Sequence, residues 1–565
     1  MTKPKIAVFS GPTATIQNSE PLVTSNKARA RHGLPLRLNP DGSPMRFDAL
    51  RPQRLAAPVT LYVEQFSAHP LEGDAAELYG PPDGYLDASG AFNRERQGPD
   101  DVGVYEVTLH PEDGLYPLPY MARQADGQAW EGDGVAPQAP AERSRQPFYP
   151  DGSRLFEEID RLGIDEDGVA NMLSSKAEFE FHRAAPSAGY KKGLPASART
   201  DVGTGDIAPE AHGRDFFPYR PIHLRAEPPM ATLARLTNVV QRALTSGRYA
   251  GAIWLEGSPN VEETTYWLNL LIDTPVPVVG NASQRPHGAA SNDGDRNIVD
   301  SVDYIASKIW ADENGRDCIG AVAILDEQIF TSRDVQKADA RPGGYVATGG
   351  HGGIIGRIGH PGAPQFSFKT IKRHTYDSAV NVTQLPSSVQ GSRVQGSKVG
   401  AIAVAVKGAD GNLLATAIPK VTIVKHARYL PEDTSGDANR EVDIIARIEN
   451  NLRAAPLAGF IAEGSAPFGA MSNAVDAALK RGTFSGMPVV KVGRGNAGGF
   501  VDPTRDPLAI AGSNLTATKA RLLLMACLMK LGCLPPALDQ ANPTQAETDA
   551  TKGKLKQYQE IFDTH

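Results

Sequence analysis

The sequence predicts an α/β protein of more than one domain, because short apolar strands alternate with amphipathic helices from residue 221 onward. The length of 565 residues exceeds that of one ordinary domain. Apolar residues make up 41% of the chain and charged residues 22%, which is typical of a globular enzyme. The alternation favours parallel strands in a doubly wound sheet, where sites form outside the carboxyl ends of the strands.

The elements of the first domain follow one another in chain order. Residues 6–9 form a strand-sized apolar run that breaks into Ser10-Gly11-Pro12-Thr13. Residues 230–244, 262–271 and 298–309 have the apolar spacing of helices, and the second of these begins with acidic residues that suit its N-terminal dipole. Residues 251–255, 277–280 and 318–325 are the predicted strands between them. A parallel sheet with helical crossovers is therefore expected.

The tail repeats this pattern, with strands at 457–463 and 487–492 and helices at 470–480 and 515–531. We therefore expect a first domain at 1–421, interrupted by an insertion at about 28–219, and a smaller α/β domain at 422–565. The insertion is rich in Pro, Gly, Asp and Arg, with a strand-like piece at 59–63 and a helix expected at 153–162. It is either a disordered segment or an ordered cap, and aromatic residues such as Trp130 and Phe156 favour the cap.

Composition excludes several classes of function. A net charge of -7 argues against a nucleic-acid partner, and the basic residues are not clustered as a membrane patch requires. No run of about 18 apolar residues occurs, and only residues 6–9 are apolar behind Lys3 and Lys5, so a cytoplasmic protein without a membrane partner is expected. Cys318, Cys527 and Cys533 lack metal-ligand spacing, and no metal is implied.

Hydroxyl and amine groups lie near the expected strand ends. Nucleophilic catalysis by a Ser or Thr requires a positioned hydroxyl, a base that takes its proton, and donors for the negative charge that develops. Thr13 follows the first strand in a Gly-Pro turn, whose main-chain N–H groups are suited to bind an anion. Lys337 provides an amine that serves as a base if its pKa is lowered.

Four segments, in one order, carry a resemblance to the asparaginase/glutaminase family of amidohydrolases. They read WLEGSPNVEETTYWL, VVGNASQRP, SNDGDRN and DEQIFTSRDVQK. The resemblance covers residues 1 to about 27 and 221–565. It implies a two-domain asparaginase-like fold, covalent catalysis on a small-molecule amide without a cofactor, and a homodimer or homotetramer.

The resemblance also implies roles for single residues. SGPT stands where the family has a strand followed by Thr-Gly-Gly-Thr, so Thr13 matches the nucleophilic threonine, with Thr15 as the alternative. Ser258 keeps the hydroxyl of the second catalytic threonine, and Lys337 ends the Arg-Asp-Val-x-Lys motif of the catalytic lysine. Glu256 is the candidate carboxylate that supports this lysine.

The departures from the family pattern concern the substrate. Pro259 replaces the aspartate that orients the lysine and holds the substrate's α-amino group, and Glu227 lies where the family binds the α-carboxylate. The substrate-binding positions are thus Thr15, Glu227, Pro259 and Asn260. No tyrosine follows the first threonine as the family's flap has it. These losses predict a non-amino-acid, cyclic or derivatised amide; a true asparaginase with rebuilt contacts and a non-catalytic binding protein are the alternatives.

Overall fold

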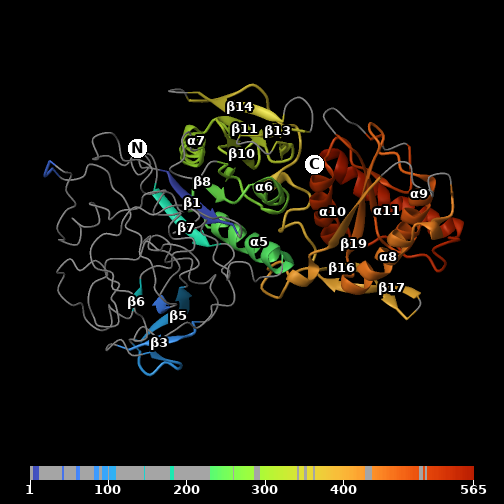
Figure 1. Cartoon of the computed structure of the whole chain (residues 1–565), viewed down its shortest axis with the longest axis horizontal. Helices are drawn as coiled ribbons and strands as arrows, with labels where there is room; N and C mark the ends of the chain where they lie inside the picture. The colour runs from blue at the N-terminus through green and yellow to red at the C-terminus, as the bar shows by residue number, and fades with distance from the viewer. Residues whose placement is uncertain are drawn as a thin grey trace. The chain divides into compact units, whose positions relative to one another are not determined.

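The computed structural model describes residues 4–11, 41–43, 59–63, 82–87, 92–99, 101–109, 145–146, 178–183, 229–258, 260–284, 293–339, 343–348, 353–359, 363–396, 398–426, 435–495, 501–502 and 505–565 (Figure 1). The chain divides into two units. Unit 1 comprises Met1–Glu227, Ala252–Gly257 and Asn281–Val302, and unit 2 comprises Pro228–Gly251, Ser258–Gly280 and Asp303–His565.

Unit 1 is built on the first predicted strand. β1 (Lys5–Ser10) pairs in parallel with β7 (Glu178–Arg183), and the side chains of residues 6–9 are buried. The chain beyond β1 also meets β8 (Gly251–Leu255), because the N–H of Gly11 donates to the Leu255 oxygen at 2.8 Å. The insertion therefore supplies a strand beside β1.

Further strands of the insertion form a separate five-stranded sheet in the order β4-β3-β5-β2-β6. Their bounds are β2 (Val59–Val63), β3 (Gly84–Leu86), β4 (Phe92–Asn93), β5 (Val102–Leu109) and β6 (Arg145–Gln146). The strand expected at 59–63 is thus present, whereas the helix expected at 153–162 lies outside the described residues.

Unit 2 contains a mixed array of strands in the order β15-β14-β11-β10-β9, of which β9 and β10 are parallel and the others antiparallel. The bounds are β9 (Val278–Asn281), β10 (Val322–Leu325), β11 (Gln328–Thr331), β14 (Ile354–Ile358) and β15 (Pro364–Phe366). Gly280 permits α6 (Asn260–Leu271) to lie directly on β9, since a Cβ there would come within 2.1 Å of Thr265 Oγ1. Trp267 on α6 donates to Thr237 Oγ1 of α5 (Pro229–Thr245) at 2.8 Å.

A second sheet in unit 2 is wholly parallel, with the order β18-β19-β20-β21. The strands are β18 (Lys420–Lys425), β19 (Ala458–Gly464), β20 (Val489–Gly493) and β21 (Ile510–Ala511). Side chains alternate between the faces of β19. Phe460 and Ala462 join the cluster of α8 (Val442–Ala454) and α9 (Asn473–Phe484), whereas Gly459 lies against Leu524 of α10 (Ala517–Leu531). Helices thus cover both faces of this sheet (Figure 1).

The remaining elements of the described part are α7 (Gly294–Ser307), α11 (Gln545–Thr564), β12 (Val335–Lys337), β13 (Tyr345–Ala347), β16 (Ser388–Gln395), β17 (Lys398–Ala405) and the short 3-10 helices η5 (Thr375–Asp377), η6 (Ala415–Ala417) and η7 (Ala438–Arg440). The predicted α/β class is confirmed. The expected strand at 318–325 begins only at Val322, because the Asp317 carboxylate accepts the N–H groups of Ile319 and Gly320 at 2.9 and 3.1 Å and holds a turn there. No helix of the described residues is long and apolar enough to cross a membrane.

Candidate active site

The lysine motif lies on a small hairpin of unit 2. β12 and β13 are antiparallel, and Lys337 stands directly opposite Tyr345. The two side chains therefore share one face of the hairpin. Lys337 Nζ lies 5.1 Å from the centroid of the Tyr345 ring, which is a cation–π contact. The N–H of Lys337 donates to the Glu262 carboxylate, which fixes this strand end to the first turn of α6.

Ser258 reaches the same tyrosine from a different segment. It lies just before α6, and its Oγ accepts a hydrogen bond from the Tyr345 hydroxyl at 2.5 Å. Tyr345 is buried, with 6% of its surface exposed, so little water competes for this contact. Two of the predicted catalytic residues, Ser258 and Lys337, are thus brought to one side chain. Asn260 is the exposed first residue of α6.

A buried ion pair lies in the segment that directly precedes β12. Arg333 donates to Asp334 Oδ1 at 2.7 Å, and both side chains are largely buried. The same guanidinium donates to Asn514 Oδ1 and to the main-chain oxygen of His565, each at 2.8 Å. Asp334 Oδ2 also accepts the Thr331 hydroxyl at 2.7 Å. This planar, multiply paired arginine holds the residues before Lys337 in one geometry.

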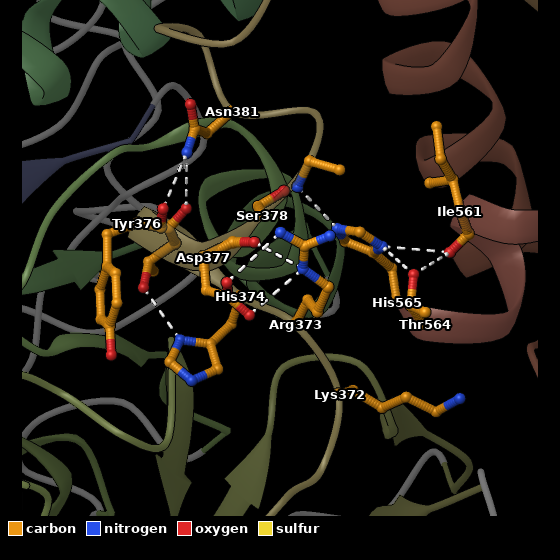
Figure 2. Close-up of polar contacts among 12 residues, drawn as sticks. Lys372, Arg373, His374, Tyr376, Asp377, Ser378, Asn381, Ile561, Thr564 and His565 are labelled. Atoms are coloured by element: carbon orange, nitrogen blue, oxygen red, sulfur yellow. Dashed lines mark hydrogen bonds and ion pairs between the residues drawn. The ribbon is translucent and has the colours of Figure 1, made fainter.

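Contacts of His565 fix the C-terminal end of α11 (Figure 2). His565 Nε2 accepts the N–H of Ala379 at 3.0 Å, and its Nδ1 lies 3.1 Å from the Ile561 oxygen. The pair of contacts requires the neutral ring with its proton on Nδ1. Figure 2 also shows Arg373 bonded to Asp377 within the segment that receives the helix.

Replacing His565 with glutamine should flatten the loss of stability in acid. Burial lowers the pKa of His565 to about 4, below the usual 6.5. Between these values the unfolded chain binds the proton more readily, so the free energy of unfolding falls as pH falls from 6.5 to 4. The histidine accounts for about 2 kcal/mol of the loss between pH 7 and 5.

Glutamine keeps one acceptor and one donor but does not titrate. Between pH 7 and pH 5 we therefore expect the free energy of unfolding of the variant to fall by about 2 kcal/mol less than that of the wild type. Urea unfolding of both proteins at pH 7 and pH 5 measures the difference, and other titrating groups cancel in the comparison. Equal pH dependence in the two proteins would contradict the neutral, buried histidine.

Lys519 and Glu262 form a buried ionisable pair, of which the Glu262 carboxylate accepts the N–H of Lys337. Lys519 on α10 is 1% exposed and donates to the main-chain oxygens of Glu262 and Ser332, the latter at 2.6 Å. Burial lowers the pKa of Lys519 to about 8, although the charge of Glu262 opposes this. Burial also raises the pKa of Glu262, against the effect of the Lys519 charge and the N–H of Lys337. Both groups are thus shifted toward their neutral forms.

Glu256 belongs to unit 1 and is also buried, with 6% exposed. Its Oε2 accepts the indole N–H of Trp254 at 2.8 Å, and its own N–H donates to the Asn281 oxygen at 3.0 Å. Gly11 lies close by, since a Cβ there would come within 3.1 Å of the Glu256 carboxyl carbon. The described end of the β1 segment therefore lies beside this carboxylate.

Four predicted site residues, Thr13, Thr15, Glu227 and Pro259, lie outside the described residues. Sequence reasoning assigned no role in the site to Glu262, Tyr345 or Lys519. The Pro-Gly-Gly sequence at 342–344 is a turn signal that could have indicated a hairpin before Tyr345, although not its register. Within the described part of the chain, no group of three or more His, Cys, Asp or Glu residues is placed to hold a metal ion.

Comparisons with known proteins point to one family. Residues 228–352 match the family model "Asparaginase, N-terminal". The chain is 28% identical over 150 residues to a glutaminase-asparaginase of Acinetobacter glutaminasificans, and 35% identical over 108 residues to an L-asparaginase of Bacillus licheniformis. It is 24% identical over 301 residues to L-asparaginase 2 of Bacillus subtilis (strain 168). These matches take in 26%, 19% and 53% of this chain, and 41%, 32% and 66% of the relatives' own lengths.

A solved structure, that of a probable cytoplasmic L-asparaginase from Campylobacter jejuni, is similar with a TM-score of 0.45 and 20% identity, over 70% of this chain and 93% of the other. This likeness is too low to carry a structural conclusion. The segments matched to the three curated relatives named above span 32% to 66% of those relatives' lengths.

Proposed function

We propose that this chain, an asparaginase-like family member, is an amidohydrolase that cleaves a carbon–nitrogen amide bond. The carrying observation is that Ser258 and Lys337, which match two catalytic positions of the family's motifs, meet at one buried side chain, Tyr345. A hydroxyl and an amine that contact the same side chain are the two kinds of group that move a proton during acyl transfer.

In the proposed reaction Thr13 Oγ attacks the amide carbonyl, and main-chain N–H groups of its turn stabilise the oxyanion. Ser258 and Lys337 pass the proton of Thr13 to the leaving nitrogen, so the C–N bond breaks and the amine or ammonia departs. Water then attacks the acyl–Thr13 ester, which releases the carboxylic acid and restores the threonine. No cofactor takes part in this chemistry. The roles of Thr13 and Ser258 rest on the motif match, with Thr15 as the alternative nucleophile.

The substrate that we propose lacks a free α-amino acid group. Pro259 has no carboxylate to pair with an ammonium, and an unpaired buried charge costs several kcal/mol, on the order of 3–5. An uncharged, cyclic or derivatised amide avoids this cost. Glu227, Asn260 and Thr15 are the other proposed contact positions. We further propose a cytoplasmic homodimer or homotetramer, from the family resemblance.

A panel of amides distinguishes the three functions considered for this chain, namely an amidase for an uncharged amide, a true asparaginase and a binding protein. It contains free asparagine and glutamine, their α-N-acylated forms, simple carboxamides and cyclic imides, with substrate loss followed by mass spectrometry. We expect kcat/KM for the best uncharged amide to exceed that for asparagine by about tenfold or more. Asparagine as the best substrate would indicate a true asparaginase, and no hydrolysis of any amide would indicate a binding protein.

Glu256 is the carboxylate that we propose to support the lysine. Replacing it with glutamine removes the charge but keeps an acceptor for the Trp254 indole, so the fold should survive. We expect kcat to fall by more than about tenfold, roughly 1.4 kcal/mol of transition-state stabilisation. Steady-state kinetics on the best substrate of the panel measure this. A smaller loss would assign Glu256 to holding Trp254 alone.

A further inference from the structure

Tyr345 touches both members of the proposed proton-handling pair. Its hydroxyl donates to Ser258 Oγ, and its ring lies under Lys337 Nζ at 5.1 Å. Its own position is fixed by the β12–β13 pairing and by burial. A buried side chain on a paired strand is restricted in its motion, so Tyr345 is suited to hold the two residues that it touches.

The hydroxyl contact has a directional consequence. A serine that accepts one hydrogen bond through its Oγ still has its own proton to donate. Because the Tyr345 hydroxyl occupies one lone pair of Ser258, the serine proton is turned away from the tyrosine. The ring contact has a separate consequence, because the face of the Tyr345 ring holds the Lys337 amine at one place beside the hairpin.

We propose that Tyr345 is a positioning residue of the amide-hydrolysis reaction, which directs the Ser258 hydroxyl through its phenol group and holds the Lys337 amine through its ring. The inference rests on the proposed function. None of the four segments that carry the family resemblance includes Tyr345. The tyrosine of the family's flap has no counterpart in residues 16–29.

Two substitutions separate the two contributions. Tyr345→Phe keeps the ring and removes the phenol, so we expect kcat to fall about tenfold to a hundredfold with KM changed less than about threefold. The pH–rate limb that belongs to Lys337 should stay where it is. Tyr345→Leu removes the ring as well, and kcat should fall further, because the Lys337 amine loses the ring that holds it.

A matched control is Tyr304→Phe. Tyr304 is fully buried on α7, and its hydroxyl has no hydrogen-bond partner within the described structure. The same chemical change there should leave kcat and the pH profile unaltered. A thermal melt of each variant shows whether the fold is retained, and Tyr345→Phe carries the decision because it preserves nearly all of the side-chain volume.

The outcome is read against Ser258→Ala and Lys337→Met on the best substrate of the panel. If these two lose activity and Tyr345→Phe matches the wild type in kcat and pH profile, the positioning role is wrong while the proposed function stands. If Ser258→Ala and Lys337→Met remain fully active, the proton-handling pair is wrong and the positioning role of Tyr345 is wrong with it, whereas hydrolysis of no amide in the panel would contradict the proposed function itself. Loss of kcat in Tyr345→Phe, with KM kept and Tyr304→Phe normal, supports the inference.

Discussion

Replacing Lys337 with methionine should lower kcat by about a thousandfold or more, roughly 4 kcal/mol, while the protein stays folded. The main-chain N–H of Lys337 bonds the Glu262 carboxylate whatever the side chain, so the hairpin keeps its link to α6. Methionine preserves much of the volume over the Tyr345 ring and removes only the amine. Steady-state kinetics and a thermal melt measure the two effects.

Lys420→Met is the matched control, because Lys420 is also a half-buried lysine on a strand of unit 2 and lies outside the proposed site. Its activity should equal that of the wild type. The residual activity of Lys337→Met should also lose one limb of the pH–rate profile. An unchanged profile would contradict the role of Lys337 in proton transfer.

Replacing Thr13 with alanine should lower turnover by several orders of magnitude, on the order of 10⁴ or more, because the covalent step has no substitute group. The N–H of Gly11 donates to the Leu255 oxygen, a main-chain contact that the substitution does not remove, so β1 should stay in place. Thr15→Ala is the paired variant and should retain most of the activity. The reverse result, with Thr13→Ala active and Thr15→Ala inactive, would move the nucleophile to Thr15.

The regular elements were predictable because their signals are local. The predicted helix at 515–531 is observed as α10 from Ala517, two residues later, because the Thr516 side chain caps it by accepting the N–H of Lys519. Strand 251–255 is observed as β8 with all five residues buried. The late start of β10 was missed because its cause is a side chain, Asp317, that competes with the strand for main-chain N–H groups.

The surroundings of the site were not predictable in the same way. Lys519 and Glu262 are 257 positions apart in the chain, and the sequence around each residue does not indicate that the Lys519 ammonium bonds the main-chain oxygen of Glu262. The contact between Arg333 and His565 spans 232 positions. Motif matching found Ser258 and Lys337, but the tyrosine between them emerged only from the register of a hairpin that joins Lys337 to Tyr345.

Trapping the acyl-enzyme tests the central claim most directly. The wild-type protein is mixed with the best amide of the panel, quenched in acid within its first turnovers, digested and mapped by mass spectrometry, with hydroxylamine in a parallel sample to capture the acyl group as a hydroxamate. The account predicts an acyl adduct on the peptide that contains Thr13, and none in Thr13→Ala. An adduct on a different residue, or amide hydrolysis with neither an adduct nor a hydroxamate, would contradict it.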